Sequence, residues 1–310
     1  MKNQKYLYKK CANSDFDIDI MFLTYNHEEY VEQALNSILM QKTKYKYRII
    51  VGEDASTDNT RKIILKYYHQ YPDRFTLILW NENVGVEKNV HRLVTMCKAR
   101  YIMTLEGDDY WTDPLKLEKQ ISFLEQHNEF IGIAHNVRCV DVSGKLLHKD
   151  YHAYPIQEDH VYGKIQALNY ELVSHTSSII YRNFWRDWGR KDYMAYHQCH
   201  ANGDLKVSIY LGLIGKIFYS REIMADHRRI FSGSSWTAQH YNRNILGFLN
   251  RNHIEIKQCM EKLLGETCDF AKTNKYIQEE ALIKLFTEFN KENLSVYYKI
   301  VKDNLKVKKN

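Results

Sequence analysis

The chain reads Tyr101-Ile102-Met103-Thr104-Leu105-Glu106-Gly107-Asp108-Asp109-Tyr110-Trp111 about one third of the way along its 310 residues. An apolar run typical of a buried strand thus ends directly in three carboxylates. Carboxylates this close repel one another unless a cation lies among them, and hard divalent ions prefer oxygen ligands. The simpler alternative is a solvated acidic turn. The stretch therefore predicts a strand that leads either into a divalent metal site or into an exposed turn.

Three strand–helix units precede this stretch. Hydrophobic periodicity predicts strands at 17–23, 48–51, 76–80 and 100–105, with helices near 28–41, 60–70 and 87–98. This alternation is typical of an α/β fold with a parallel, doubly wound sheet, in which ligands bind beyond the carboxyl ends of the strands. Four polar loops should therefore converge on one crevice: Thr24–Asn26, Glu53–Ser56, Asn81–Gly85 and Glu106–Asp109.

The second half of the sequence is more mixed. We expect helices at 114–127, 162–168 and 204–213, a hairpin from 131–140 and 146–148, strands at 177–181 and 216–219, and helices from about 236 onward. The expected organisation is an N-terminal arm at 1–14, two halves of one domain at 15–112 and 113–235, and a helical C-terminal extension at 236–310.

Composition excludes several classes of protein. The first 230 residues show no basic stripe with interleaved aromatic residues, so we expect no nucleic-acid partner. The six cysteines are widely spaced and form no zinc-ligand pattern. The N-terminus lacks the apolar core of a signal peptide, and no run of 18 apolar residues could span a membrane. We therefore expect a cytoplasmic protein with reduced thiols.

The four loops together resemble those of family 2 glycosyltransferases of the GT-A fold, a large bacterial group of inverting enzymes that use nucleotide-sugar donors. The pieces that match in order and spacing are Leu23–Asn26, Gly52–Thr60, Asn81–Gly85 and Glu106–Trp111. The resemblance covers residues 17 to about 230. It implies a Rossmann-like, mostly parallel sheet with helices on both faces, a nucleotide-sugar-binding half at 15–112 and an acceptor-binding half at 113–235.

The resemblance also implies a donor site. Its expected residues are Thr24, Tyr25, Asn26, Asp54, Asn83, Gly85, Lys88, Glu106, Asp108 and Arg228. The first three match the loop that frames the nucleotide. Asp54 matches the residue that accepts hydrogen bonds from the base, usually uracil, and Arg228 matches a diphosphate clamp. Glu53 and Glu106 stand where the family more often has Asp.

The resemblance further implies a Mn²⁺ or Mg²⁺ ion, which would stabilise the charge on the leaving nucleoside diphosphate. Its expected ligands are Asp108, Asp109 and His227, while Trp111 and His175 are expected at the acceptor. Trp111 could equally be a core residue, and His175 and His227 could equally be structural.

An inverting transfer needs a group that takes the proton of the acceptor hydroxyl. The resemblance implies that this group is an Asp at the start of a helix in the second half of the domain. The residue that best matches it is Asp204, at the start of a predicted helix. A helix N-cap is the simpler interpretation of this residue. Asp187 and Asp192 are weaker competitors because they lie in an irregular, Trp-rich segment.

These features predict a metal-dependent inverting glycosyltransferase. It would move a sugar from a nucleotide-sugar, with a UDP-sugar as the expected donor, to a glycan or a lipid-linked saccharide in the synthesis of bacterial surface polysaccharide or glycoconjugates. A nucleotidyltransferase is one alternative, but the loop Thr24–His27 lacks the Gly-rich phosphate sequence of such enzymes. A non-catalytic nucleotide-sugar-binding module is the other, and the intact acidic triplet argues against it.

The C-terminal end is rich in lysine. Residues 291–310 carry six Lys against Glu292 and Asp303, a surplus of four positive charges. Such an end could rest on the anionic inner face of the plasma membrane, where a lipid-linked acceptor would be found. The favoured alternative is a helix pair packed on the protein with a frayed tail.

Overall fold

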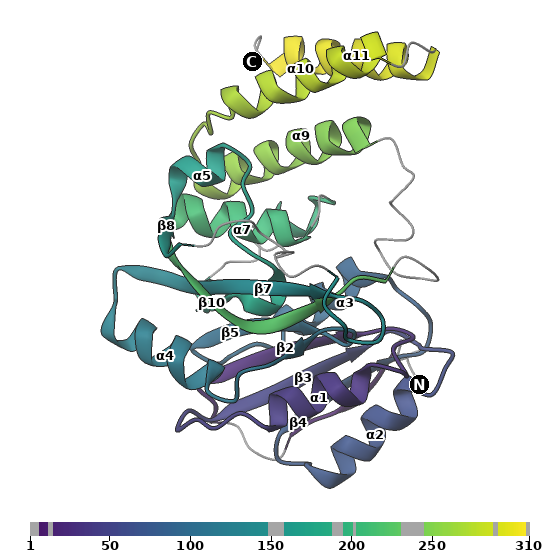
Figure 1. The fold of residues 1–310 in the computed structure, drawn as a ribbon, viewed down its shortest axis with the longest axis vertical. Coiled ribbons are helices and arrows are strands. Elements are labelled where there is room, and N and C mark those ends of the chain that lie inside the picture. The colour runs from purple at the N-terminus through teal and green to yellow at the C-terminus, as the bar shows by residue number, and fades with distance from the viewer. Residues whose placement is uncertain are drawn as a thin grey trace. The chain divides into compact units, whose positions relative to one another are not determined.

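A computed structural model describes residues 6–11, 15–147, 158–187, 195–200, 203–230, 245–287 and 291–307 (Figure 1). Their contacts divide the chain into two compact units. The first consists of 1–162, 173–188 and 215–235, and the second of 163–172, 189–214 and 236–310. The division differs from the expected boundaries because two segments before residue 215 group with the C-terminal helices.

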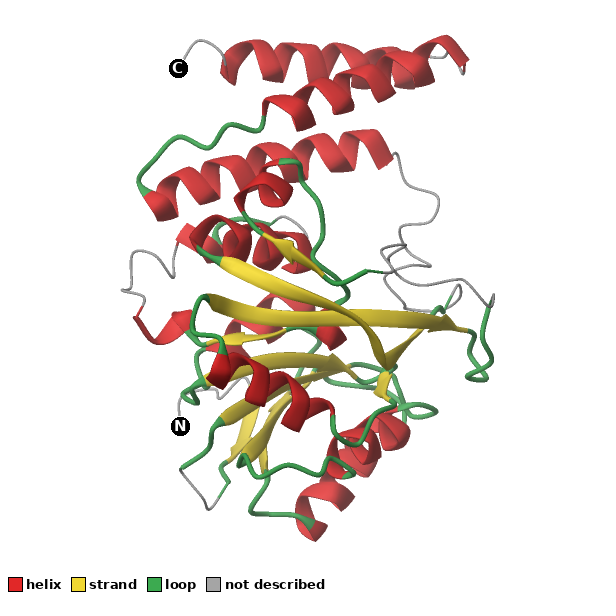
Figure 2. Cartoon of the chain, turned by 60° about the vertical axis from the view of Figure 1, so that its left-hand side comes forward, coloured by secondary structure: helices red, strands yellow, loops and turns green. Residues whose placement is uncertain are grey.

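One sheet organises the first unit, with its strands in the order β1-β4-β3-β2-β5-β9-β7-β10-β6 and with β8 paired to β10 (Figure 2). The strands are β1 (Tyr6–Lys9), β2 (Ile18–Thr24), β3 (Tyr47–Glu53), β4 (Phe75–Trp80), β5 (Tyr101–Glu106), β6 (Tyr110–Trp111), β7 (Phe130–Val140), β8 (His160–Tyr162), β9 (Ile180–Arg182) and β10 (Lys216–Arg228). The helical segments are α1 (Val31–Leu39), α2 (Thr60–Gln70), α3 (Val86–Val94), α4 (Lys116–Gln126), η1 (Thr176–Ser178) and η2 (Phe184–Asp187). The run β4-β3-β2-β5 is parallel, as predicted.

Three elements differ from the prediction. The N-terminal arm contains β1, which pairs antiparallel with the edge of β4. The predicted strand at 177–181 begins as the 3₁₀ turn η1, and β9 follows it. β10 extends to Arg228, well beyond the predicted end at 219, because it pairs along β7 and then with β6. Charged residues in its second half had hidden this extension from the sequence pattern.

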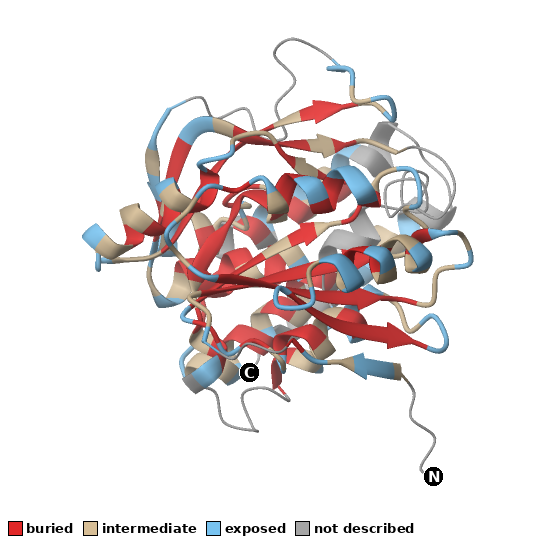
Figure 3. Cartoon of the chain, turned by 90° about the horizontal axis from the view of Figure 1, so that it is seen from below, coloured by how far each residue is buried: buried red, intermediate tan, exposed pale blue. Residues whose placement is uncertain are grey.

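Side-chain alternation along β2 shows how the sheet is covered. Ile18, Ile20 and Phe22 belong to one large core cluster with α1, α2 and α4 residues. The residues between them face the other side. There Asp19 meets the segment that follows α3, and it accepts hydrogen bonds from the backbone N–H groups of Lys98 and Ala99. In Figure 3 buried residues dominate the central strands, so the core lies on both faces of the sheet.

The second unit is helical in its described residues. Its helices are α5 (Lys164–Leu168), α7 (Gly203–Ile214), α9 (Ile245–Leu264), α10 (Ala271–Thr287) and α11 (Lys291–Val307). Ile277 and Ala281 of α10 and Ile300 of α11 form a small shared core. The Lys-rich end therefore begins as a packed helix, and the membrane contact stays a prediction. None of the helices in the described ranges is both long and apolar enough to cross a membrane.

The buried ion pair between Asp19 and Arg48 yields the first prediction. Asp19 has no exposed surface and accepts from Arg48, with Nη2–Oδ1 at 2.7 Å, as well as from two backbone N–H groups. Asp19→Ala should lower the free energy of unfolding by about 3–5 kcal/mol, because Arg48 would stay buried without its partner. Urea denaturation measures the loss. Asp15→Ala, which breaks an exposed pair with Lys46, is the control and should leave stability almost unchanged.

Candidate active site

The first two loops of the expected crevice hold each other in place. Asn26 has a φ of 55°, and its backbone N–H donates to Ser56 Oγ at 3.0 Å. Its side-chain oxygen accepts from the N–H of Thr57 at 2.8 Å. A positive φ is uncommon for a residue other than glycine, and Asn tolerates it best. The loops after β2 and β3 are therefore interlocked at the carboxyl edge of the sheet, where the sequence predicted a site.

The loop after β5 approaches the loop after β2 closely at Gly107. A Cβ atom here would lie 2.7 Å from His27 Nδ1 and 2.8 Å from Thr24 Oγ1. Only glycine allows this approach without displacing those side chains. The approach places Asp108 near His27, with Oδ2 and Nε2 3.9 Å apart. Asp108 therefore faces His27, while the charges of Asp109 and His227 also act on it.

The chain reverses after Asp109, and this turn builds the centre of the site. β6 pairs antiparallel with β10, with Trp111 opposite Ala225 and Tyr110 opposite Asp226. Continuing this register by one residue brings Asp109 beside His227. The backbone N–H of Arg228 donates to Asp109 Oδ1 at 2.9 Å. Strand pairing thus joins two residues that are 118 positions apart.

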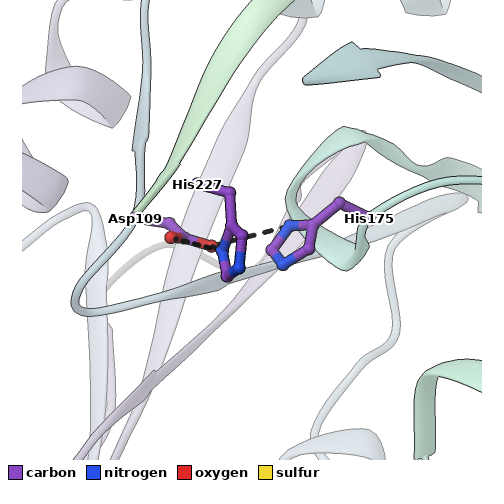
Figure 4. A group of neighbouring side chains, drawn as sticks. All are labelled: Asp109, His175 and His227. Carbon is purple, nitrogen blue, oxygen red and sulfur yellow. Dashed lines mark hydrogen bonds and ion pairs between the residues drawn. The ribbon is translucent and has the colours of Figure 1, made fainter. Parts of the chain in front are cut away.

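Two histidines face the carboxylate of Asp109 (Figure 4). His227 Nδ1 lies 3.1 Å from Asp109 Oδ1, and His175 Nδ1 lies 3.6 Å from Asp109 Oδ2. The two rings are 4.1 Å apart between centroids. His175 precedes η1, and its Nδ1 lies 2.9 Å from Ser177 Oγ. Asp109 is almost fully buried, so this is an enclosed polar group rather than a solvated acidic turn.

The three side chains of the group favour different protonation states because their pKa values shift in different ways. Burial alone would raise the pKa of Asp109, but His227 and His175 outweigh it, and the pKa is lowered. Burial would also lower the pKa of His227, but Asp109 raises it above the ordinary value. The pKa of His175 falls to about 3, because burial and the neighbouring His227 both disfavour its protonated form. The group is thus a carboxylate, an imidazole that favours a proton, and a neutral imidazole.

The same three side chains could hold a metal ion. One ligand atom from each of Asp109, His175 and His227 lies within 4.8 Å of the others. One carboxylate and two imidazoles suit divalent transition metals, whereas Mg²⁺ prefers oxygen ligands in an octahedron. The donor set therefore fits a divalent transition-metal ion better than Mg²⁺. Asp109 and His227 were predicted as ligands, and His175, which we expected at the acceptor, joins them in the place expected of Asp108.

Arg228 does not match its predicted role. It is 3% exposed, and four of its five N–H groups donate to protein oxygens: those of Asp108, Asp141, Val142 and Gln33. Its guanidinium also lies over the rings of Tyr30 and Tyr110. Arg228 is therefore an internal brace, and it does not offer the free guanidinium that a diphosphate clamp needs.

Trp111 is likewise not a stacking platform for an acceptor sugar. It is 1% exposed, its Nε1–H donates to the carbonyl of Ser177 at 3.1 Å, and Lys116 lies over its ring. The alternative interpretation of Trp111 as a core residue is therefore the correct one. Its hydrogen bond supports the turn that carries His175.

Asp54 organises the loop after β4. Its two carboxylate oxygens accept from the N–H groups of Val84 and Gly85 at 2.8 and 3.0 Å. Burial raises the pKa of Asp54, and these two hydrogen bonds oppose the rise. The carboxylate thus ties down the 81–85 loop, while Asn83 and Lys88 are exposed. Contact between Asp54 and a base stays a prediction.

The remaining predicted residues lie in different settings. Thr24 is buried, whereas Tyr25 and Glu106 are half-buried on the loops just described. Asp204 lies in the first turn of α7, in the second unit, and is half-buried. Asp187 ends η2, and Asp192 lies outside the described residues.

With the sheet topology and these loops established, the sequence can be compared with known families. The sequence pattern of the family described as Glycosyl transferase family 2 matches residues 19–187, more than half of the chain. The chain belongs to glycosyl transferase family 2. The matched segment contains Asp109 and His175, whereas His227 and Asp204 lie beyond it.

Two curated relatives share part of their sequence with this glycosyl transferase family 2 chain. Rv1520 of Mycobacterium tuberculosis is 36% identical over 167 residues, which are 53% of this chain and 46% of that protein. The putative glycosyltransferase EpsE of Bacillus subtilis is 33% identical over 132 residues, 43% of this chain and 47% of EpsE. The chain thus spans about half the length of these relatives.

The fold is similar to that of TarS from S. aureus, solved as residues 1–349 in complex with UDP-GlcNAc. The TM-score is 0.62 at 14% identity, and the match covers 93% of this chain and 80% of that chain. At this identity the likeness concerns the fold alone. The predicted GT-A fold, with its mostly parallel central strands and additional C-terminal helices, is confirmed.

The close approach at Gly107 yields the second prediction. Gly107→Ala should lower the free energy of unfolding by about 1–3 kcal/mol, because the added methyl group would force Thr24 and His27 away. Thermal unfolding measures the change. Gly203→Ala is the control, because no atom of the described residues lies within 4 Å of its added Cβ. Equal effects of the two substitutions would contradict the steric argument.

Proposed function

We propose that this chain transfers a sugar from a nucleotide-sugar donor to a hydroxyl of a saccharide acceptor. The observation that carries the proposal is the group of Asp109, His175 and His227 at the carboxyl edge of the parallel strands, which could hold an ion. Family membership supports glycosyl transfer. A uridine diphosphate sugar is the proposed donor, because a protein of the same fold was solved with UDP-GlcNAc.

Asp109, His175 and His227 would hold a Mn²⁺ ion beside the donor diphosphate. When bound, the ion supplies a positive charge that stabilises the leaving diphosphate. The chain itself contributes burial, because a site from which water is excluded strengthens every charge interaction inside it. Arg228 contributes by fixing Asp109 through its backbone N–H and Asp108 through its guanidinium.

The interlocked loops around Asn26 and Asp54 would form the nucleotide site. Thr24 ends β2 and Tyr25 and Asn26 follow it, while exposed Asn83 lies on the loop that Asp54 holds and exposed Lys88 lies in the first turn of α3. A loop with exposed polar side chains above a fixed anchor is suited to fold over a base and ribose. Uracil offers one imide N–H, which a carboxylate such as Asp54 can accept.

Asp204 is the proposed base for the acceptor hydroxyl. An inverting transfer is one displacement at the anomeric carbon, so the attacking hydroxyl must lose its proton to a nearby group. The proposed acceptor is a glycan or a lipid-linked saccharide of the bacterial surface. A cytoplasmic location is proposed as well, because all six cysteines lie in the described residues, are buried and form no disulfide.

The third prediction concerns the ion and the nucleotide. UDP should raise the Tm by several degrees in Mn²⁺ and much less with a chelator, because Asp109 would hold an ion that favours binding of the diphosphate. Asp109→Asn should remove the ion-dependent part of the shift, whereas Glu158→Gln, on the surface, should leave it intact. GDP should give a smaller shift than UDP. Equal stabilisation by UDP with and without Mn²⁺ would refute the metal assignment.

Product analysis tests the reaction itself. Incubation of a UDP-sugar with acceptor should release UDP, the product of sugar transfer. Release of pyrophosphate from UTP and a sugar phosphate would instead identify a nucleotidyltransferase. Binding without either product would identify a non-catalytic module.

The fourth prediction concerns the base. Asp204→Asn should lower kcat by about 10²-fold or more and leave the donor Kd unchanged, because it removes only a proton acceptor. Steady-state kinetics and calorimetry measure the two quantities. If Asp204 is only a helix cap, the substitution would lower stability and leave turnover near normal. Asp187→Asn, which removes the competing candidate at the end of η2, should leave kcat near normal.

A further inference from the structure

A set of buried polar side chains lies behind the turn that carries His175. Lys116 and Gln120 of α4 and His135 of β7 have no exposed surface. Buried polar groups are costly unless they form hydrogen bonds, and a buried lysine is among the most costly. None of the three belongs to the ion group described above, so their burial calls for another reason.

Gln120 connects α4 to the His175 turn. Its Nε2 donates to the carbonyl of Ser178 at 2.8 Å and to that of Ile133 at 3.3 Å. Its Oε1 accepts a hydrogen bond from Lys116 Nζ. An amide has a donor end and an acceptor end, and Lys116 at the acceptor end favours the same orientation as the two carbonyls at the donor end. Lys116 therefore orients Gln120, and Gln120 holds the end of η1.

Other hydrogen bonds hold the same turn from different elements. Ser174 Oγ donates to the carbonyl of His135 at 2.7 Å, and Trp111 Nε1 donates to the carbonyl of Ser177 at 3.1 Å. Within the turn, Ser178 Oγ donates to the carbonyl of His175 at 2.7 Å. Hydrogen bonds from α4, β6 and β7 thus fix the turn that begins at His175. The Nδ1 atom of His175 is the one that faces Asp109.

Lys116 is poorly explained as a contribution to stability. Among the described residues no carboxylate lies within ion-pair distance of its Nζ, and burial lowers its pKa well below the ordinary value. The ring of Trp111, 4.8 Å from Nζ, and the charge of Asp113 offset part of the cost, but an apolar side chain of the same length would avoid the burial of an amine altogether. His135 Nε2 also lacks a hydrogen-bond partner in the described part of the chain. A polar set retained under these conditions indicates a role other than stability.

We propose that Gln120, oriented by Lys116, is a positioning residue that fixes His175 against Asp109 for ion binding. The inference rests on the proposed metal site. Partners behind a metal ligand orient its ring, and their loss commonly weakens metal binding by about 10–100-fold. Neither side chain touches the proposed ion, so the effect would act through the Ser178 carbonyl and the η1 turn.

The test compares Mn²⁺ binding with stability in the full chain. Calorimetric titration with Mn²⁺ should show about tenfold weaker binding in Gln120→Leu than in the wild type. The Tm of this variant should also fall, since two carbonyls and Lys116 lose their partner. Lys116→Met should weaken Mn²⁺ binding while its Tm stays equal or rises, because it removes a buried amine. A role in stability alone would give the opposite pattern for Lys116→Met.

Gln41→Leu is the matched control. Gln41 is also buried, and its Nε2 donates to the carbonyls of Ser37 and Asp113, but it does not contact the His175 turn. This variant should lose Tm and retain Mn²⁺ affinity within about twofold, well short of the loss expected behind a ligand. Unchanged Mn²⁺ binding in Gln120→Leu, beside a binding wild type, overturns the positioning role alone. A wild-type protein that binds no Mn²⁺ overturns the metal site and the positioning role together.

Discussion

The buried carboxylate of Asp109 is the interaction on which the site depends. It lies in the turn between β5 and β6, accepts the N–H of Arg228, and faces His227 and His175. A buried carboxylate needs positive or donating neighbours, and all those neighbours come from distant parts of the chain. The pairing of β6 with β10 and the η1 turn must therefore both form before the buried charge of Asp109 has its full set of neighbours. This requirement couples the closing of the sheet to the assembly of the site.

Arg228 shows how one side chain can stabilise several loops at once. Its guanidinium donates to the backbone carbonyls of Asp108, Asp141 and Val142 and to the side-chain oxygen of Gln33. It thereby joins the acidic loop, the segment after β7 and α1. Arg suits this role because its planar group offers five donors in fixed directions. The residue that resembled a ligand-binding arginine is thus used to hold the ligand-binding loops.

The chain places its functional candidates in two units. The ion group and the loops of the proposed nucleotide site belong to the first unit, whereas Asp204 lies in the second. The Lys116–Gln120 pair belongs entirely to the first unit, so its proposed effect concerns ion binding only.

The sequence by itself determined the parallel strands from β2 to β5, the helices between them and the four loops at their carboxyl ends. These features depend on local periodicity and on the alternation of strands and helices, which the sequence displays directly. It also indicated Asp109 and His227, because both stand in polar motifs. The place of His175 beside them could not be predicted, since a short 3₁₀ turn has no hydrophobic period. The brace formed by Arg228, the burial of Trp111 and the length of β10 were decided only by tertiary structure, because each depends on pairing between segments that are about a hundred or more residues apart in the chain.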